Sequence, residues 1–194
     1  MTTSIMERLR DETAPYHDQV ERNRYAKGIM SQDITQEDYR IYLEKFHGFM
    51  KPLEAKAAAQ AASESGMDLD IRAKTPLLEQ DLRYLGLTEE QIQQLPECGS
   101  LPDMSIPARL LGCFYVMEGS TLGGQIITRQ LMKFMPLTAE QGIQYFNGYG
   151  EQTRDRWGEF RELVLSKCVT VEEEEAAVDA AKETFRLLDE WLNA

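Results

Sequence analysis

Apolar residues recur along most of the chain at spacings of three and four, which is the period of an amphipathic α-helix. The first stripe of this kind consists of Ile5, Leu9, Thr13, His17 and Val20. Pro15 interrupts it, so we expect a kink or a restart of the helix just before His17. A second stripe consists of Tyr39, Tyr42, Phe46, Phe49 and Leu53. Thr35 and Asp38 resemble a capping box at the start of that helix, and Pro52 predicts a bend within it.

Start and stop signals divide the rest of the chain into further helices. Thr75 and Pro76 predict the start of a short helix that Gly86 ends, because proline suits the first turn and glycine the position after the last. A capping box begins another short helix at Thr88, and Pro96 stops it. The remaining expected segments are a helix over 105–134, a capping box at 138–141 followed by a loop through 150, and helices over 152–166 and 170–192. Since no β-type alternation of useful length occurs, the pattern predicts one all-α domain over residues 1–194, a bundle of roughly seven or eight helices.

Charge and composition narrow the class of protein. The chain has 33 acidic and 21 basic residues, a net charge of −12, which disfavours a nucleic-acid binder because phosphate contacts need a basic face. A hydrophobic fraction of 42% is enough for a core, and no apolar run approaches the length of a membrane-spanning helix. The charged N-terminal turns lack the apolar segment of a signal peptide, so we expect a cytoplasmic protein without a membrane anchor. Cys98, Cys113 and Cys168 form no CxxC pair, which favours buried, reduced thiols over a zinc site.

His17 is one of only two histidines, and its spacing allows two interpretations. Glu21 follows at i+4, and a carboxylate in that place can hold one ring nitrogen while the other binds a metal. The same spacing fits a histidine at the edge of the core that a neighbouring carboxylate satisfies. The residues alone leave both open, and the structural interpretation is the commoner one.

His47 ends the segment Glu44–His47, an E-x-x-H pattern on a predicted helix. Carboxylate-bridged di-iron bundles use two such motifs. The residue three before His17 is Ala14, so a second motif is absent and the di-iron interpretation fails. We therefore expect His47 to be a structural histidine.

Three glycines interrupt the predicted helix over 105–134. Gly119 and Gly123 are one turn apart and Gly124 is adjacent, so one flank of the helix lacks side chains although each glycine costs about 1 kcal/mol relative to alanine. Two purposes fit: close packing against another helix, or close approach of the backbone to a flat ligand. No strand precedes the segment, so it is not a dinucleotide-binding fingerprint.

Two segments together resemble a known family. Leu9–His17, with Glu21 following, looks like the proximal-helix motif of heme oxygenases, and Tyr115–Gln125 looks like their glycine-rich distal helix. The order and separation of the two motifs also match, most closely those of the bacterial soluble members. The resemblance implies an all-α bundle in which a heme, both prosthetic group and substrate, lies between the two helices.

The resemblance also implies roles for individual residues. His17 would be the iron ligand, with Glu21 steering its ring. The wall over the oxygen site would consist of Gly119, Ser120, Gly123 and Gly124. The other residues that would contact heme or its carboxylates are Arg10, Tyr115, Thr121, Trp157 and Arg161.

Two positions depart from the family pattern. Many heme oxygenases carry an aspartate directly after the first distal glycine, where it anchors water; here that residue is Ser120, and hydroxyls of Ser120 or Thr121 could hold water instead. Near the heme propionates the family shows a basic residue four before an arginine, whereas this chain has Trp157 and Arg161. One expected cation is therefore missing.

The resemblance implies an enzyme that uses heme, dioxygen and a separate electron donor, such as ferredoxin or a flavin reductase, since the chain shows no flavin or nicotinamide motif. The products would be biliverdin, carbon monoxide and ferrous iron. Two other functions are compatible with the residues: a heme carrier or sensor without catalysis, and a heme-free helical interaction protein.

Overall fold

Polar side chains in front of the helices set the points at which several of them begin. The computed structural model describes residues 4–60 and 62–194. Thr88 and Thr170 form the predicted capping boxes, each accepting a hydrogen bond from the backbone three residues later. Thr35 accepts from the backbone N–H of Asp38, as expected, and Ser4 forms a further capping box with Glu7.

The described residues form a bundle without strands, which confirms the predicted all-α fold. The helices of eight or more residues are α1 (Ile5–Val20), α2 (Arg24–Ser31), α3 (Gln36–Ala59), α6 (Thr75–Tyr84), α8 (Pro107–Leu131), α10 (Thr153–Lys167) and α11 (Val171–Asn193). The shorter ones are α4 (Ala62–Ser65), α5 (Leu69–Arg72), α7 (Glu89–Gln93), α9 (Gln144–Asn147) and the 3-10 helix η1 (Gly150–Gln152). None of the helices described is both long and apolar enough to cross a membrane.

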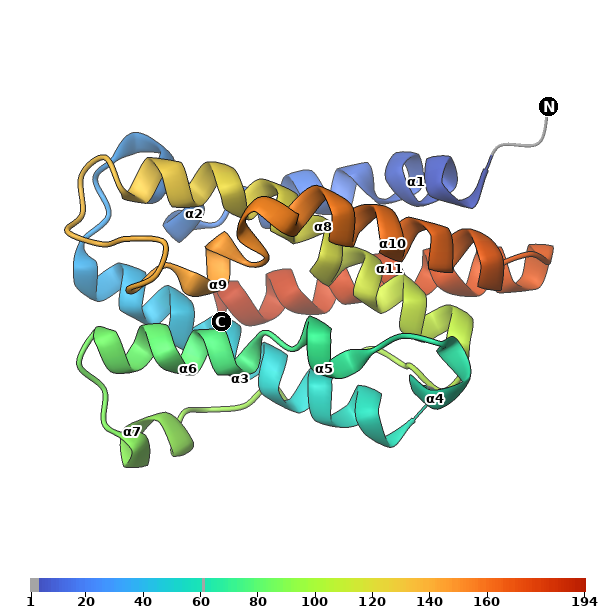
Figure 1. The fold of residues 1–194 in the computed structure, drawn as a ribbon, viewed down its shortest axis with the longest axis horizontal. Coiled ribbons are helices and arrows are strands. Elements are labelled where there is room, and N and C mark those ends of the chain that lie inside the picture. The colour runs from blue at the N-terminus through green and yellow to red at the C-terminus, as the bar shows by residue number, and fades with distance from the viewer. Residues whose placement is uncertain (1–3, 61) are drawn as a thin grey trace.

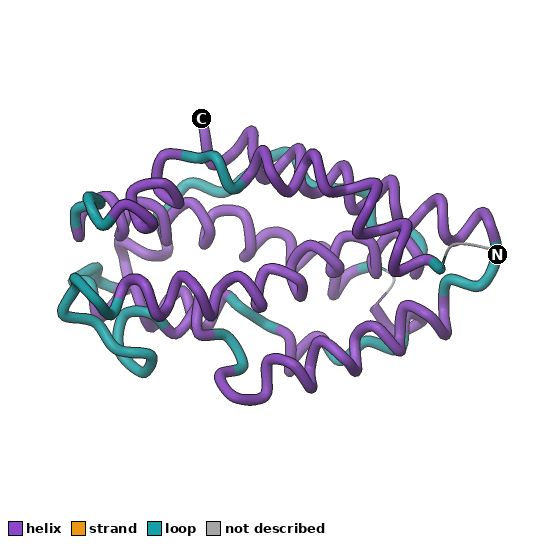
Figure 2. Tube along the Cα trace, turned by 90° about the horizontal axis from the view of Figure 1, so that it is seen from above, coloured by secondary structure: helices purple, strands orange, loops and turns teal. Residues whose placement is uncertain are grey.

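The long helices run along the long axis of the molecule, with most loops at its ends (Figures 1 and 2). α11 packs against both α8 and α1, α10 packs against α8, and α3 packs against α6. α8 thus lies at the centre of the bundle, and its positions 110–114 and 116–118 are buried.

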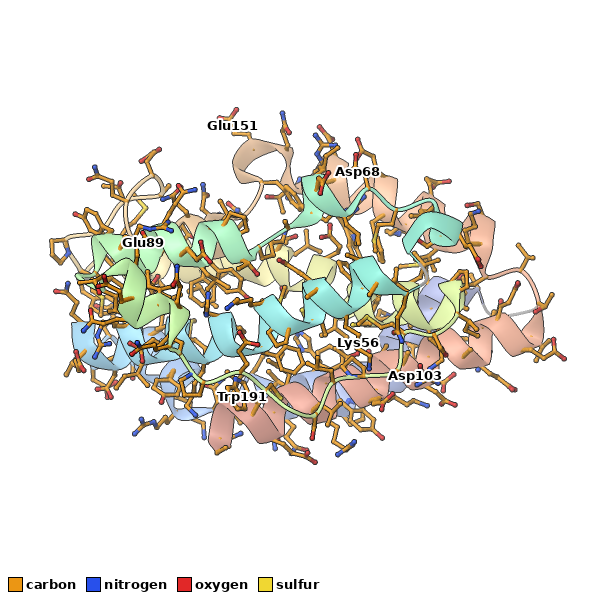
Figure 3. All side chains as sticks on the ribbon, turned by 90° about the horizontal axis from the view of Figure 1, so that it is seen from below. Lys56, Asp68, Glu89, Asp103, Glu151 and Trp191 are labelled. Atoms are coloured by element: carbon orange, nitrogen blue, oxygen red, sulfur yellow. The ribbon has the colours of Figure 1, made fainter. Side chains whose placement is uncertain are left out.

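The segment between α7 and α8 fastens α3 to the bundle. Lys56 Nζ donates a hydrogen bond to the carbonyl oxygen of Pro102 (2.7 Å), and Figure 3 shows Lys56 beside the segment that carries Asp103. Nearer the middle of α3, Trp191 Nε1 donates to the carbonyl oxygen of Lys45 (2.7 Å). These contacts fix α3 against both α11 and the connecting segment.

Two expectations about prolines and caps need correction. α1 runs unbroken through Pro15, so the helix does not restart there. The predicted capping box at 138–141 is instead a tight turn, in which Thr138 and Gln141 exchange two backbone hydrogen bonds of 3.0 Å. The reason is Gly142, whose φ of +87° lies in the left-handed region and prevents a helix from continuing through it.

α8 and α11 approach so closely that no side chain fits at the crossing. A Cβ atom built on Gly112 would overlap the carbonyl oxygen of Ala177. The contact is between backbones, so relief would require the two helices to move apart. Gly112 is therefore a packing glycine.

We expect Gly112→Ala to lower the free energy of unfolding by about 1–3 kcal/mol, because overpacking a core outweighs the gain in helix propensity. Thermal or urea unfolding measures this. Gly158→Ala on α10 is the matched control, since its Cβ would meet nothing within 4 Å and should stabilise the protein slightly. Equal stability of the two variants would contradict the assignment of Gly112.

Candidate functional site

A cavity of about 590 Å³ opens between α1 and α8. α3 and the residues Tyr145 and Phe146 close its inner end, and side chains of α2, α10 and α11 complete the lining. The volume lies within the range of roughly 300–1,000 Å³ that is usual for small-molecule sites. The cavity therefore brings both sequence motifs, which are about a hundred residues apart, to one place.

His17 lines the cavity from α1, and its side chain is 53% exposed. Its Nε2 lies 3.6 Å from Glu21 Oε1, so the i+4 spacing brings the pair together at slightly more than hydrogen-bond distance. The imidazole meets the ring of Phe185 edge-on, with 5.8 Å between centroids. Asp18 also lies nearby, within a cluster whose possible ligand atoms are all within 4.8 Å of one another. The exposed imidazole can offer a nitrogen to a metal in the cavity.

The three glycines Gly119, Gly123 and Gly124 of α8 have different surroundings. A Cβ on Gly123 would meet nothing within 4 Å, so the backbone there faces open space. A Cβ on Gly124 would overlap the carbonyl oxygen of Phe146, so this glycine permits close packing. Gly119 is intermediate, since its Cβ would lie 3.7 Å from Trp157, an ordinary contact. Gly123 is thus the position that leaves room for a ligand.

The two hydroxyls of the glycine-rich segment both donate to the helix itself. Ser120 Oγ donates to the carbonyl oxygen of Met117 (2.7 Å) and Thr121 Oγ1 to that of Glu118 (2.6 Å). Both residues line the cavity. With their protons used in this way, the hydroxyl oxygens can act toward other groups as acceptors.

The residues predicted to bind carboxylates lie at different places. Arg10 lines the cavity, is 69% exposed and pairs with Asp11 (2.7 Å). Trp157 and Tyr115 also line it, with their rings 5.7 Å apart. Arg161 is exposed and lies outside the lining, one turn after Trp157 on α10, so its contact with a ligand stays a prediction.

A buried ionic cluster lies behind the glycine-rich segment. Glu118 is 1% exposed and accepts hydrogen bonds from Tyr149 (2.8 and 3.0 Å) and from Arg72. Lys74 Nζ lies 3.7 Å from the same carboxylate. We call Glu118, Arg72, Lys74 and Tyr149 the Glu118 cluster. Sequence reasoning missed Arg72, Lys74 and Tyr149, because their contacts with Glu118 span 31 to 46 residues and leave no local pattern.

Asp81 fixes the inner end of the cavity. Its carboxylate accepts hydrogen bonds from the backbone N–H groups of Gln144 (2.9 Å) and Tyr145 (2.8 Å), which begin α9. Burial raises the pKa of Asp81 to about 6, although these hydrogen bonds oppose the shift. Asp81 thereby holds in place Tyr145 and Phe146, both of which line the cavity.

His47 lies away from the cavity. Its side chain is 1% exposed, and Nε2 lies 3.6 Å from Glu79 Oε1. Burial lowers the pKa of His47, which favours the neutral ring. Glu44 pairs with Arg40 rather than with His47. This geometry agrees with the structural role expected for His47.

Both the sequence and the fold resemble those of known proteins. The family model for heme oxygenase matches residues 3–194. A heme oxygenase of Xanthomonas campestris pv. campestris (strain 8004) is 26% identical over 152 residues, which cover 78% of this chain and 87% of the relative.

Solved structures of the same fold cover nearly the whole chain. The heme oxygenase of Leptospira interrogans has a TM-score of 0.76 at 18% identity and covers 98% of both chains. Heme oxygenase-1 of the cyanobacterium Synechocystis sp. PCC6803, solved in complex with heme, has a TM-score of 0.73 at 17% identity, over 98% of this chain and 91% of that one. At these identities the likeness shows the fold. Because the family model spans almost the entire sequence, this protein belongs to the heme oxygenase family.

Proposed function

We propose that this protein cleaves heme to biliverdin, carbon monoxide and ferrous iron, with dioxygen and a separate electron donor. The observation that carries the proposal is the cavity itself, in which the imidazole of His17 on α1 and the open backbone at Gly123 on α8 line one space. A ligand between them would touch a nitrogen donor on one side and bare helix backbone on the other. The solved complex of the cyanobacterial relative with heme supports the choice of ligand.

The residues present fit a heme. The inner lining is aromatic and apolar, with Tyr42, Phe46, Met50 and Phe146, which suits a flat hydrophobic ring system. The missing Cβ at Gly123 leaves space where the ring face would lie. Arg10 near the opening provides a cation for a carboxylate. Bound heme would supply redox-active iron and, as the substrate, the porphyrin carbon that is oxidised.

His17 and Glu21 would hold the iron side. One ring nitrogen of His17 would ligate the iron, and Glu21 would accept a hydrogen bond from the other nitrogen and thereby fix the ring orientation. Both side chains are exposed and line the cavity, His17 from the last turn of α1 and Glu21 from its C-cap.

The glycine-rich segment would confine the opposite side. Gly123 lets the backbone approach the ring, and Gly124 holds α8 against the backbone of Phe146. The acceptor oxygens of Ser120 and Thr121 can hold water there. Tight confinement restricts where an oxidant can react, which favours one porphyrin carbon over the others.

Purified protein mixed with hemin tests the proposal. We expect a shifted Soret band, followed by bilin absorption and free ferrous iron when ascorbate or a ferredoxin system is added in air. A heme spectrum that persists under these conditions would identify a carrier or sensor. An unchanged hemin spectrum would identify a heme-free protein.

Replacing His17 with alanine should abolish bilin formation while the protein still binds heme, because packing and Arg10 remain and the helix tolerates alanine well. Bilin absorption and hemin titration measure the two effects, and added imidazole should restore part of the turnover. Tyr16→Ala is the matched control, since this neighbouring side chain does not line the cavity. Wild-type turnover of His17→Ala without imidazole would refute the assignment.

Gly123→Ala and Gly124→Ala should separate ligand space from packing. Alanine at Gly123 gains about 1 kcal/mol of helix propensity, so the melting temperature should stay or rise while bilin yield falls. Alanine at Gly124 must displace the backbone of Phe146, so it should lose about 1–3 kcal/mol of stability. Calorimetry with bilin assays checks both. A loss of stability with full activity in Gly123→Ala would mean that this glycine, too, serves packing.

Trp157 and Arg161 should affect heme seating. Arg161→Ala should weaken heme binding about tenfold, roughly 1.4 kcal/mol, and broaden the set of biliverdin isomers, because one carboxylate loses its cation. Trp157→Lys should narrow that set by adding a cation at the lining position. Chromatographic separation of the isomers provides the measurement. Unchanged isomer patterns in both variants would show that neither side chain reaches the heme.

A further inference from the structure

Lys74 is unlike the other charged residues that line the cavity. Arg10, His17, Asp18 and Glu21 are exposed, whereas the side chain of Lys74 is 4% exposed. Among the charged residues described in the lining, it is the least exposed. Burying an ammonium group is costly unless its donors find partners, so its presence in an apolar cavity requires an explanation.

The backbone of Lys74 is fixed independently of its side chain. Glu54 on α3 accepts a hydrogen bond from the backbone N–H of Lys74 (2.6 Å) and a longer one from Thr75 (3.4 Å), at the start of α6. The carboxylate of Glu54 thus caps the helix and also places a negative charge near the ammonium. The position at which Lys74 enters the cavity is set by these contacts.

The ammonium is held from two sides but is not saturated by them. It lies 3.7 Å from the centre of the Tyr149 ring, which is a close cation–π contact. It lies 3.7 Å from Glu118 Oε1, beyond normal hydrogen-bond distance. Glu118 already accepts from Tyr149 and Arg72. An ammonium has three donors, so these contacts leave hydrogen-bonding capacity at a residue that lines the cavity.

The charged groups around Lys74 act in opposite directions. Burial lowers the pKa of Lys74 and the guanidinium of Arg72 acts in the same direction, whereas the carboxylates of Glu118 and Glu54 favour the charged form. Tyr149 stays neutral, because burial and Glu118 raise the pKa of its hydroxyl. The ammonium of Lys74 therefore combines a positive charge with N–H groups that can donate hydrogen bonds.

We propose that Lys74 is the buried cationic hydrogen-bond donor of the cavity, held by the Glu118 cluster so that it stabilises negative charge on a small oxygen ligand bound there. This inference rests on the proposed function, since it takes heme as the occupant that brings such a ligand. Glu118 and Tyr149 are then positioning residues, which act through the ammonium.

The test is a pH titration of the ferric heme complex followed by visible absorption. The alkaline form of such a complex carries one more negative charge in the cavity than the acid form, so a nearby ammonium lowers the midpoint. Lys74→Met should raise the midpoint by about half a pH unit or more. Lys74→Arg keeps the charge and should leave the midpoint close to that of the wild type. Lys51→Met is the matched control, because this half-exposed lysine pairs with Glu97 away from the cavity.

Two further comparisons keep the result decisive. If circular dichroism shows that Lys74→Met does not fold, Lys74→Gln removes the charge with a polar side chain and replaces it. An unchanged midpoint in the neutral variant would overturn the proposal, as would a wild-type complex that shows no such transition. An unchanged midpoint with about tenfold weaker heme binding would also overturn it, because Lys74 would then hold a heme carboxylate. Heme binding by the wild-type protein tests the proposed function separately. If the wild type binds no heme, both the proposed function and this inference are refuted.

Discussion

The position of α8 is the constraint on which the rest of the structure depends. This helix must touch α11 and the backbone of Phe146 while it leaves one face open toward α1. Glycine satisfies both requirements because it has no Cβ. Gly112 and Gly124 allow the close contacts with α11 and Phe146, and Gly123 leaves the face toward α1 open. Each helical glycine costs about 1 kcal/mol of helix propensity, so tertiary contacts must offset this loss. Gly112 and Gly124 gain such contacts directly, whereas Gly123 gains none from the protein.

Local charge, rather than net charge, determines the electrostatics of the cavity. The chain carries a net charge of −12, yet the buried cluster at α8 places Arg72 and Lys74 beside Glu118. Exposed charges are screened over about 8 Å at physiological ionic strength, while buried ones are screened much less. An anionic ligand therefore experiences chiefly the cations of the cavity. The acidic outer surface has little influence at that depth.

Sequence reasoning succeeded where the signal was local. Periodicity and capping boxes gave the long helices, and the spacing of His17 and Glu21 placed both on one face of α1. It failed where the structure depends on distant residues. The segment 138–141, predicted to be a capping box, is a turn because of Gly142. Lys74 precedes Thr75 and Pro76, and no local pattern indicates that it lines a cavity. The glycines of α8 were predictable in part: the sequence shows their positions in the helix but not which distant residues pack against them.

The two walls of the cavity differ in how firmly they are held, and this difference has a consequence for specificity. His17 is 53% exposed, lies 3.6 Å from Glu21 and touches Phe185, so its ring is only loosely fixed and a bound ligand would have to immobilise it. Ordering such a side chain costs about 0.5–1.5 kcal/mol. The opposite wall is fixed before any ligand arrives, because Glu118, one residue before Gly119, is buried and is anchored by Arg72 and Tyr149 from two other segments. In the proposed heme cleavage, selecting one carbon of a near-symmetric ring would require a wall that does not move, and α8 forms the firmly held wall. In that proposal the bond to iron would come from His17 on the less firmly held wall, where adaptability would not reduce selectivity.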